Sequence, residues 1–481
     1  MAQFLGIDLG GTVIKAGVYN ENGEELCVFE KAADNLNLKE GFAERDMTQL
    51  WQGVCVCIQG ILKKSPEIRD AIKGVSFSSH GKGLYLLDKE GRPLRNGINS
   101  SDTRSVEIVK KWLNDGTADK AYPYGMQQIW TGHPVSILAW LKLNEPENYS
   151  KIGSILMVHD YIRYMMTGEL GAEITNISGS NIYNIKTGQY EAKLLSLFGI
   201  EECEDALRPI VKSSQQCGSV TAKAADETGL LKGTPVFGGF FDVVSSAIST
   251  GVVDDSAISC AAGTWSIATA VHDSIPESDN HYIWGNYCIE DLYFVHEGSP
   301  TSASNLAWWK NNILTALDYD AINRMVAEVQ QKKPATSLFY LPYLYGSNFS
   351  VGMNAGLYGL QGYHTTADVV NAIYEGIVFS HLLNQDHIVA ITKNAKVIRM
   401  NGGPTRSDVW MRMFASASNL PIEISQIQQT GCRAAALCAA VGSGYFSSFR
   451  DAVQKTAEKM KVVEPDSVQH DYLRERYQEF V

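Results

Sequence analysis

The sequence lacks several features that would assign it to familiar protein classes. Its nine cysteines among 481 residues include no CxxC pair, so the spacing of a structural zinc site is missing. Cys55 and Cys57 are two positions apart on a predicted helix and would face different directions, so we expect free thiols. Basic residues are in deficit, with 41 against 53 acidic residues and a net charge of −12. This balance argues against general nucleic-acid or anionic-membrane partners.

Long hydrophobic runs and targeting signals are also missing. The uncharged run 256–271 contains Gly263, Thr264 and Ser266, and it is shorter than the ~20 residues that a membrane-spanning helix needs. The opening MAQFLGIDLGG has no basic region followed by an apolar core, so we expect no signal peptide. We therefore predict a cytoplasmic protein.

What the sequence does contain is typical of a large globular chain. Apolar residues make up 45% and charged residues 20%. Glycine, with 42 residues, is slightly above its usual share of ~7%. No linker or low-complexity segment interrupts the chain, so we predict two α/β domains, residues 1–245 and 246–481.

Apolar periodicity predicts the elements of the first half. A continuous apolar run is typical of a buried strand, and Thr234–Phe241 would bring Asp242 to the carboxyl end of such a strand. The other predictions are antiparallel strands Phe4–Asp8, Val13–Tyr19 and Leu26–Phe29, a strand Gly74–Ser78, and helices Thr48–Lys63, Arg104–Leu113, Val135–Leu143 and His159–Met166.

The second half opens with the same pattern as the first. Two β-prone runs, Ala257–Cys260 and Trp265–Val271, flank Gly263 and Thr264, which suggests a structural repeat. The further predictions are a strand Lys396–Met400 and helices Asp368–Ile391, Arg406–Ser418, Gly431–Gly442 and Asp451–Met460, the last two closing the fold.

Glycine turns provide three candidate phosphate sites. In the segment Asp8-Leu-Gly10-Gly11-Thr12, with Lys15 beyond it, backbone amides can approach an anion closely, and Asp8 can hold Mg²⁺ through water. It is neither a P-loop nor a dinucleotide fingerprint, and a plain hairpin turn is the alternative.

The second and third candidate turns lie in the other half of the chain. Gly263-Thr264 is one, and Asn401-Gly402-Gly403-Pro404 before Ser407 is the other. The latter joins a strand to a helix N-terminus, which suits a nucleotide but also an ordinary tight turn.

Two further groups of residues suit transfer of a phosphoryl group to a polyol. Asp242, at a strand end, can accept a proton from an attacking hydroxyl, although it can also serve as a helix N-cap. The second group consists of polar residues that could bind a sugar; the alternative is that they are ordinary surface or capping residues. They are His80, Gly81, Lys82, Asp102, Arg104 and His133.

Together these residues resemble the carbohydrate kinases of the FGGY family over the whole chain. The most specific match joins Ala355–Leu360 to Asp368–Glu375, and Gly41–Asp46 and His159–Tyr161 are similar to further landmarks. The resemblance implies an actin-like pair of ribonuclease-H-like α/β domains flanking a deep nucleotide and sugar cleft. Asp242 would then be the base and Asp8 the Mg²⁺ ligand. ATP would meet Gly10, Gly11, Thr12, Lys15, Gly263, Thr264, Gly402, Gly403 and Ser407.

Within the family, stretches such as Ser79–Leu84 and Ser100–Arg104 are similar to the bacterial branch that acts on L-xylulose. This implies ATP-dependent phosphorylation of a ketopentose at its 5-hydroxyl, with a homodimer as a family expectation. Lys82 and Arg104 can also meet a carboxylate, so D-xylulose, L-ribulose, a deoxy-ketose and 3-keto-L-gulonate stay open as acceptors. An actin-like ATPase without a sugar acceptor and a sugar sensor without catalysis are the alternatives outside this chemistry.

Overall fold

The computed structural model describes residues 2–36, 38–263, 265–333, 336–346 and 353–481. The chain divides into two units, each assembled from three segments. Unit 1 contains Met1–Val253, Asp273–Val295 and Gln429–Ala457, and unit 2 contains Asp254–His272, His296–Gln428 and Glu458–Val481. These units are discontinuous in sequence and do not test a single boundary. The predicted domain boundary near residue 245 therefore stays a prediction.

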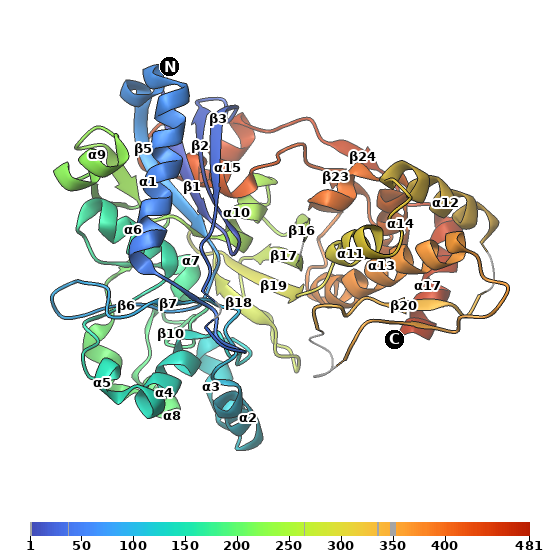
Figure 1. Cartoon of the computed structure of the whole chain (residues 1–481), viewed down its shortest axis with the longest axis horizontal. Coiled ribbons are helices and arrows are strands. Elements are labelled where there is room, and N and C mark those ends of the chain that lie inside the picture. Colours follow the sequence, from blue (N-terminus) through green and yellow to red (C-terminus); the bar gives the residue numbers. More distant parts are fainter. Residues whose placement is uncertain (1, 37, 264, 334–335, 347–352) are drawn as a thin grey trace. The chain divides into compact units, whose positions relative to one another are not determined.

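Unit 1 is built on a mixed sheet with the strand order β13-β14-β5-β1-β2-β3. Among these strands, Figure 1 labels β5, β1, β2 and β3. The antiparallel pairs β1–β2 and β2–β3 confirm the predicted opening hairpins, and β1, β14 and β15 run parallel to β5. The strands are β1 (Gln3–Leu9), β2 (Val13–Asn20), β3 (Glu25–Ala32), β5 (Ile72–Ser79), β13 (Gln216–Ser219), β14 (Pro235–Phe237) and β15 (Phe240–Phe241).

Two helices cover opposite faces of this sheet. Ile14 and Gly17 are three residues apart on β2 and therefore face opposite sides. Ile14 lies against Gly53 of α1 (Met47–Lys64), and Gly17 lies against Cys432 of α15 (Thr430–Gly442). The backbone of α15 comes so close that a Cβ on Gly6 of β1 would lie 1.9 Å from the Cys432 carbonyl oxygen. The predicted helices at both places are confirmed.

The predicted continuous strand Thr234–Phe241 is wrong, because the chain breaks between β14 and β15. Gly239 has a φ of +108°, and a Cβ on Gly238 would lie 2.4 Å from the carbonyl oxygen of Lys212. After the break, Phe241 pairs with Ser79, the last residue of β5. Asp242 therefore still reaches the carboxyl end of the parallel strands, as predicted.

The remaining elements of unit 1 are short. Its helices are α2 (Val106–Asn114), α3 (Thr117–Gly125), α4 (Pro134–Asn144), α5 (Pro146–Tyr149), α6 (Val158–Thr167), α7 (Ile174–Ile177), α8 (Ala192–Phe198), α9 (Ala222–Thr228), α10 (Asp242–Ser249) and α16 (Phe449–Lys455). Its small strands are β4 (Glu44–Arg45), β6 (Tyr85–Leu87), β7 (Gly97–Ile98), β8 (Ser154–Leu156), β9 (Ala172–Glu173), β10 (Tyr183–Asn184), β11 (Gln189–Tyr190), β12 (Ile210–Val211) and β18 (Ile283–Asn286).

Unit 2 repeats the central arrangement of unit 1. Its strands follow the order β19-β17-β16-β22-β23-β24, in which an antiparallel β16–β17 hairpin is followed by the parallel strand β22. The same succession, β2-β1-β5, forms the centre of unit 1. The strands are β16 (Ala257–Ala262), β17 (Ser266–His272), β19 (Tyr293–Ser299), β22 (Val397–Asn401), β23 (Ile422–Ile424) and β24 (Lys461–Val463), with β20 (Phe339–Leu341) pairing β21 (Gly356–Tyr358). The predicted structural repeat agrees with this topology.

The helices of unit 2 include three that the sequence analysis does not predict, Ser304–Asn312, Tyr319–Lys332 and Ser467–Phe480. The helices are α11 (Ser304–Asn312), α12 (Tyr319–Lys332), α13 (Thr366–Ile391), α14 (Asp408–Ser418) and α17 (Ser467–Phe480). Helix α17 buries Leu473 and Arg476 among mostly polar residues, so its apolar periodicity is weak. The predicted helix Asp451–Met460 is also too long, since α16 ends at Lys455.

Two predicted absences concern cysteines and membrane spans. All nine cysteines are free thiols, as expected. Across the described ranges, no helix has the length and apolar character needed to cross a membrane.

Candidate active site

The first predicted phosphate turn lies at the end of β1 in unit 1. The Gly10 N–H donates to the carbonyl oxygen of Val13 (3.0 Å), which closes the turn and leaves Gly11 and Thr12 exposed. Asp8 and Lys15 are register partners across the β1–β2 hairpin. Burial raises the pKa of Asp8 above its usual range, against the attraction of Lys15.

The N-terminus of α15 meets Asp8, a contact that sequence reasoning missed. A Cβ on Gly431 would lie 2.4 Å from the Asp8 carboxyl carbon, so the lack of a side chain at Gly431 lets the helix come this close to Asp8. Lys15 Nζ donates to Gln429 Oε1 (2.9 Å) immediately before the helix. The free N–H groups and dipole of a helix N-terminus favour negative charge. The signal in the sequence is Thr430-Gly431 before an alanine-rich helix, 423 residues after Asp8 and therefore unconnected to it by any local pattern.

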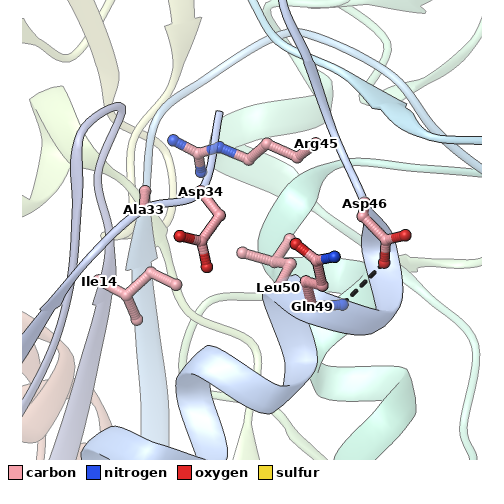
Figure 2. Close-up of a pocket in the computed structure, with 7 residues that line it drawn as sticks. All are labelled: Ile14, Ala33, Asp34, Arg45, Asp46, Gln49 and Leu50. Atoms are coloured by element: carbon pink, nitrogen blue, oxygen red, sulfur yellow. Dashed lines mark hydrogen bonds between the residues drawn. The ribbon is translucent and has the colours of Figure 1, made fainter. Parts of the chain in front are cut away.

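Arg45 stabilises the first phosphate turn through hydrogen bonds to its backbone and to Asn35. Its Nη2 donates to the Gly10 carbonyl oxygen (2.8 Å), and its Nε donates to Asn35 Oδ1 (2.7 Å). Asn35 Nδ2 in turn donates to the Gly11 carbonyl oxygen (2.8 Å). Figure 2 shows Arg45 beside a recess of about 10 Å³, room for about one water molecule, so this recess does not admit a sugar.

Asp242 lies at the carboxyl end of the same sheet. It is the first residue of α10, whose N-cap is Phe241, so the alternative that Asp242 is the N-cap is wrong. Its side chain reaches solvent. The low-dielectric surroundings, and then the charge of Asp8, raise the pKa of Asp242 to about 7, against the Val243 N–H and the Lys82 ammonium. A carboxyl group with a pKa near neutrality suits a general base.

The loop after β5 brings three predicted sugar-binding residues to Asp242. Buried His80 has its pKa lowered to about 3 by burial and by Arg45, so it is neutral. A Cβ on Gly81 would lie 2.3 Å from the Phe241 ring, which places this loop against the residue before Asp242. Lys82 has a φ of +64°, and burial lowers its pKa to about 8 against the attraction of Asp242. We call Asp8, Lys82 and Asp242 the open charged group.

Asp102 and Arg104 belong instead to a paired cluster inside unit 1. Both oxygens of Asp102 accept from Arg104, through its backbone N–H, Nε and Nη2 (2.8–2.9 Å), and Oδ2 also accepts from the Ala43 N–H (2.7 Å). Arg104 Nη2 further donates to Glu44 Oε1 (2.7 Å), and these side chains are at most 3% exposed. We call Glu44, Asp102 and Arg104 the buried charged cluster. The substrate role of Asp102 and Arg104 stays a prediction.

His133 is buried as well. Its Nδ1 lies 2.8 Å from Asn181 Nδ2, and its side chain is fully enclosed. Its predicted role in sugar binding stays a prediction.

The glycine turns of unit 2 lie at the ends of neighbouring parallel strands. Ala261 pairs with Asn401, so exposed Gly263 and Gly402 follow β16 and β22 at the same sheet edge. Gly402 has a φ of +109°, and a Cβ there would lie 2.2 Å from the Ala262 carbonyl oxygen. Gly403 is exposed too. Thr264 lies outside the described residues.

Ser407, predicted to lie on the nucleotide side, caps a helix. Its Oγ accepts from the Trp410 N–H at the start of α14 (3.2 Å) and donates to Asn323 Oδ1 (2.6 Å). Its contact with a nucleotide stays a prediction.

A wider groove of unit 1 lies away from these residues. It has a volume of about 520 Å³ and is lined by Phe4, Lys73 and Pro235 among others. These residues stand near the amino ends of β1, β5 and β14, whereas Asp8 and Asp242 stand at the carboxyl ends of parallel strands. In α/β sheets, ligands usually bind at the carboxyl ends.

Comparison with known proteins identifies the family. Residues 3–249 match the N-terminal domain of the FGGY family of carbohydrate kinases, and residues 258–443 match its C-terminal domain. This chain belongs to the FGGY family of carbohydrate kinases. The predicted family is therefore confirmed.

Relatives and solved structures agree with this assignment. The chain is 42% identical to the L-xylulose/3-keto-L-gulonate kinase of Escherichia coli K12, over 100% of this chain and 96% of that protein. It is also 42% identical to a probable L-xylulose kinase of Pasteurella multocida, over 100% and 98%. The ligand-bound xylulose kinase of Lactobacillus acidophilus superposes with a TM-score of 0.92 at 24% identity, over 100% and 98% of the two chains.

These findings confirm the predicted fold class and the general activity. The chain has the two-domain α/β fold of the actin-like ATPase type. It is an ATP-dependent carbohydrate kinase that phosphorylates a small-molecule sugar.

Proposed function

We propose that this kinase transfers the γ-phosphoryl group of ATP to the 5-hydroxyl of L-xylulose, with Asp242 as the general base. The observation that carries this proposal is the position of Asp242. It reaches solvent on the first turn of α10, beside the ends of β1 and β5, with a pKa near 7. The identity to L-xylulose kinases supports the choice of acceptor.

The proposed step moves one proton and one phosphoryl group. The Asp242 carboxylate accepts the proton of the acceptor hydroxyl as its oxygen forms a bond to the γ-phosphorus. The bond from the γ-phosphorus to the β,γ-bridging oxygen breaks, and ADP leaves with that electron pair. The cations Lys82 and Lys15 lie on either side of this carboxyl end and offset the negative charge of the phosphates.

The glycine turns are proposed to hold ATP. The Gly11 amide and the Thr12 hydroxyl can donate to phosphate oxygens, since both are exposed on this turn. Gly10 is proposed to line the same site, although its own N–H already donates to the Val13 carbonyl oxygen. In unit 2 we propose Gly263, Thr264, Gly402, Gly403 and Ser407 as further nucleotide contacts.

Asp8 is the proposed ligand of Mg²⁺. Mg²⁺ is usually held by one or two carboxylates together with waters and substrate phosphates, and Asp8 fits this donor set beside an open turn. When bound, the ion supplies charge neutralisation on the phosphates. A cytoplasmic location and a homodimer stay predictions.

A sugar acid is the second candidate acceptor. The Lys82 ammonium forms no hydrogen bond or ion pair with the side chains of the described residues, although the charge of Asp242 acts on it. Arg104, in contrast, is paired with Asp102 and Glu44. Of the two cations predicted to meet a carboxylate, we therefore propose Lys82 for an acid such as 3-keto-L-gulonate, which the name of the Escherichia coli relative includes.

An acceptor panel tests the proposal. ADP release is measured with L-xylulose, D-xylulose, L-ribulose, a deoxy-ketose and 3-keto-L-gulonate, each at several concentrations and against a sample without sugar. We expect the highest kcat/KM with L-xylulose and almost no ADP release without sugar. A higher kcat/KM with another sugar would overturn the acceptor assignment, and turnover independent of any sugar would support an ATPase instead.

A further inference from the structure

Gln127 is a buried amide with an unused oxygen. The side chain is 2% exposed, and its Nε2 donates to the backbone carbonyl oxygens of Trp284 and Met126. These two bonds fix the orientation of the amide, with Nε2 toward the two carbonyl oxygens and Oε1 on the other side. Its Oε1 has no hydrogen-bond partner in the part of the chain that the structure describes. A buried acceptor without a donor is unfavourable, so such atoms often mark the place of a ligand group.

Gly179 lies beside this oxygen. A Cβ on Gly179 would stand 3.8 Å from Gln127 Oε1 and 3.8 Å from Lys82 Cε, with the Asn176 carbonyl oxygen at 3.5 Å. These are ordinary contact distances, so a methyl-sized group fits between the two side chains. Gln127, Lys82 and Gly179 come from three separate segments, and no sequence motif connects them.

The loop that carries Lys82 is fixed to the same place. Asn176, three residues before Gly179, accepts the Lys82 backbone N–H on its Oδ1 (3.1 Å). The Lys82 ammonium and the Asp242 carboxylate attract each other across this region. An acceptor and a cation thus converge on one glycine near the proposed base.

We propose that Gln127 and Lys82 form a hydroxyl-reading subsite over Gly179, in which Gln127 Oε1 accepts a hydrogen bond from one hydroxyl of the acceptor sugar. The inference rests on the proposed function, because it takes Asp242 as the base at the reacting end of the same sugar. This subsite restricts the substrate class, because the acceptor must carry a hydroxyl on one particular carbon of the open-chain ketose. A ketose without that hydroxyl leaves the amide oxygen unsatisfied and is rejected.

The first test replaces the amide by a side chain of similar size that accepts no strong hydrogen bond. For wild type and Gln127→Met, kcat/KM is measured with L-xylulose and with its 1-, 3- and 4-deoxy analogues. In wild type, one analogue should lose about 100-fold or more, since a site built for a hydroxyl discriminates strongly against its absence. In Gln127→Met, kcat/KM for the same analogue should be within about 3-fold of that for L-xylulose, because the amide oxygen that accepts the hydroxyl is missing. Equal discrimination in both proteins would overturn the proposal.

The second test fills the subsite without straining the backbone. Gly179→Ala places its methyl group at ordinary contact distances, so the fold should tolerate it. We expect a rise in the KM for the sugar of at least about 10-fold, with the KM for ATP within about 2-fold. Gly362→Ala is the matched control, since nothing lies within 4 Å of its Cβ, and its kinetics should equal wild type. An unchanged sugar KM in Gly179→Ala would also overturn the proposal.

The same measurements separate this inference from the proposed function. If L-xylulose is phosphorylated and both variants behave as wild type, the subsite is wrong and the proposed function stands. If another sugar is the preferred acceptor, the proposed function fails. The deoxy analogues of that sugar then test the subsite in the same way, with the same two outcomes.

Discussion

Unit 1 holds two groups of charged residues that look alike in the sequence and differ in the structure. In the open charged group, Asp242 reaches solvent, and Lys82 and Asp242 act on each other through charge. In the buried charged cluster, Asp102 and Arg104 are fully enclosed, and several hydrogen bonds occupy both oxygens of Asp102. An oxygen whose bonding capacity is filled has little left for a ligand.

This difference separates a group suited to proton transfer from a cluster that stabilises the fold. A carboxylate whose desolvation and neighbouring carboxylate outweigh its hydrogen bonds and nearby cations keeps a raised pKa, which a proton-transferring group needs. A carboxylate paired with an arginine is held ionised, as the lowered pKa of Glu44 shows. The buried cluster therefore fixes the loops around β4 and β7, and the open group carries the proposed reaction.

Breaking the buried cluster should give the largest loss of stability. Arg104→Met leaves the buried Asp102 without its cation and Glu44 with only Arg95, so we expect the free energy of unfolding to fall by about 3–5 kcal/mol. Denaturant unfolding at pH 7.5 measures it. Arg92→Met removes an exposed ion pair and should leave the free energy of unfolding almost unchanged. A loss as small in Arg104→Met would show that the cluster does not support the fold.

A smaller effect is expected where buried polar residues support the open group. The buried Thr175 Oγ1 accepts the Phe241 N–H (2.9 Å), directly before Asp242, and donates to Glu173 (2.7 Å). Thr175→Val removes the acceptor of that N–H and one of the four donors to Glu173, so we expect about 1–3 kcal/mol of lost stability and a lower kcat. Thr175→Ser keeps the hydroxyl and should recover most of both. Equal behaviour of the two variants in unfolding and turnover would contradict this support role.

The smallest effect should be a shift of the pH profile. Below its own pKa of about 8, Lys82 is cationic and favours the ionised form of Asp242, so Lys82→Met should raise the pKa of Asp242 above about 7. Because the base must be ionised, kcat/KM rises with pH through this pKa. The acidic limb of the profile should therefore move to higher pH in Lys82→Met. An acidic limb at the wild-type position would show that Lys82 does not act on the base; Lys193→Met, on the surface, is the control.

Much of the fold could be predicted from local patterns. Apolar, β-prone runs bounded by turns indicate β1 and β2, and helical spacing indicates α1 and α13, because each pattern is complete within one segment. Asp242 could be found because it follows an apolar run. The break at Gly238 and Gly239 within that run depends on contacts with Phe77 and Lys212, which no local pattern contains.

The site was predicted less completely for the same reason. The pairing of Arg104 with Glu44 joins residues 60 positions apart, and the approach of Gly431 to Asp8 joins opposite ends of the chain. Sequence reasoning predicted that Arg104 contacts the sugar, whereas the structure shows it paired with Asp102 and Glu44 inside the protein. Gln127 belongs to no motif, and its role is indicated by a buried oxygen that has no partner among the described residues and by its position beside Gly179.

The most direct test of the central claim is single-turnover phosphoryl transfer in Asp242→Asn, measured together with ATP binding. Asparagine keeps the shape of the side chain but does not accept the proton. We predict ATP affinity within about threefold of wild type and transfer slower by about 10²–10⁴-fold. Asp70→Asn, an exposed aspartate elsewhere in unit 1, should transfer at the wild-type rate. Near-normal transfer in Asp242→Asn would contradict the account, because the open charged group would then not contain the base.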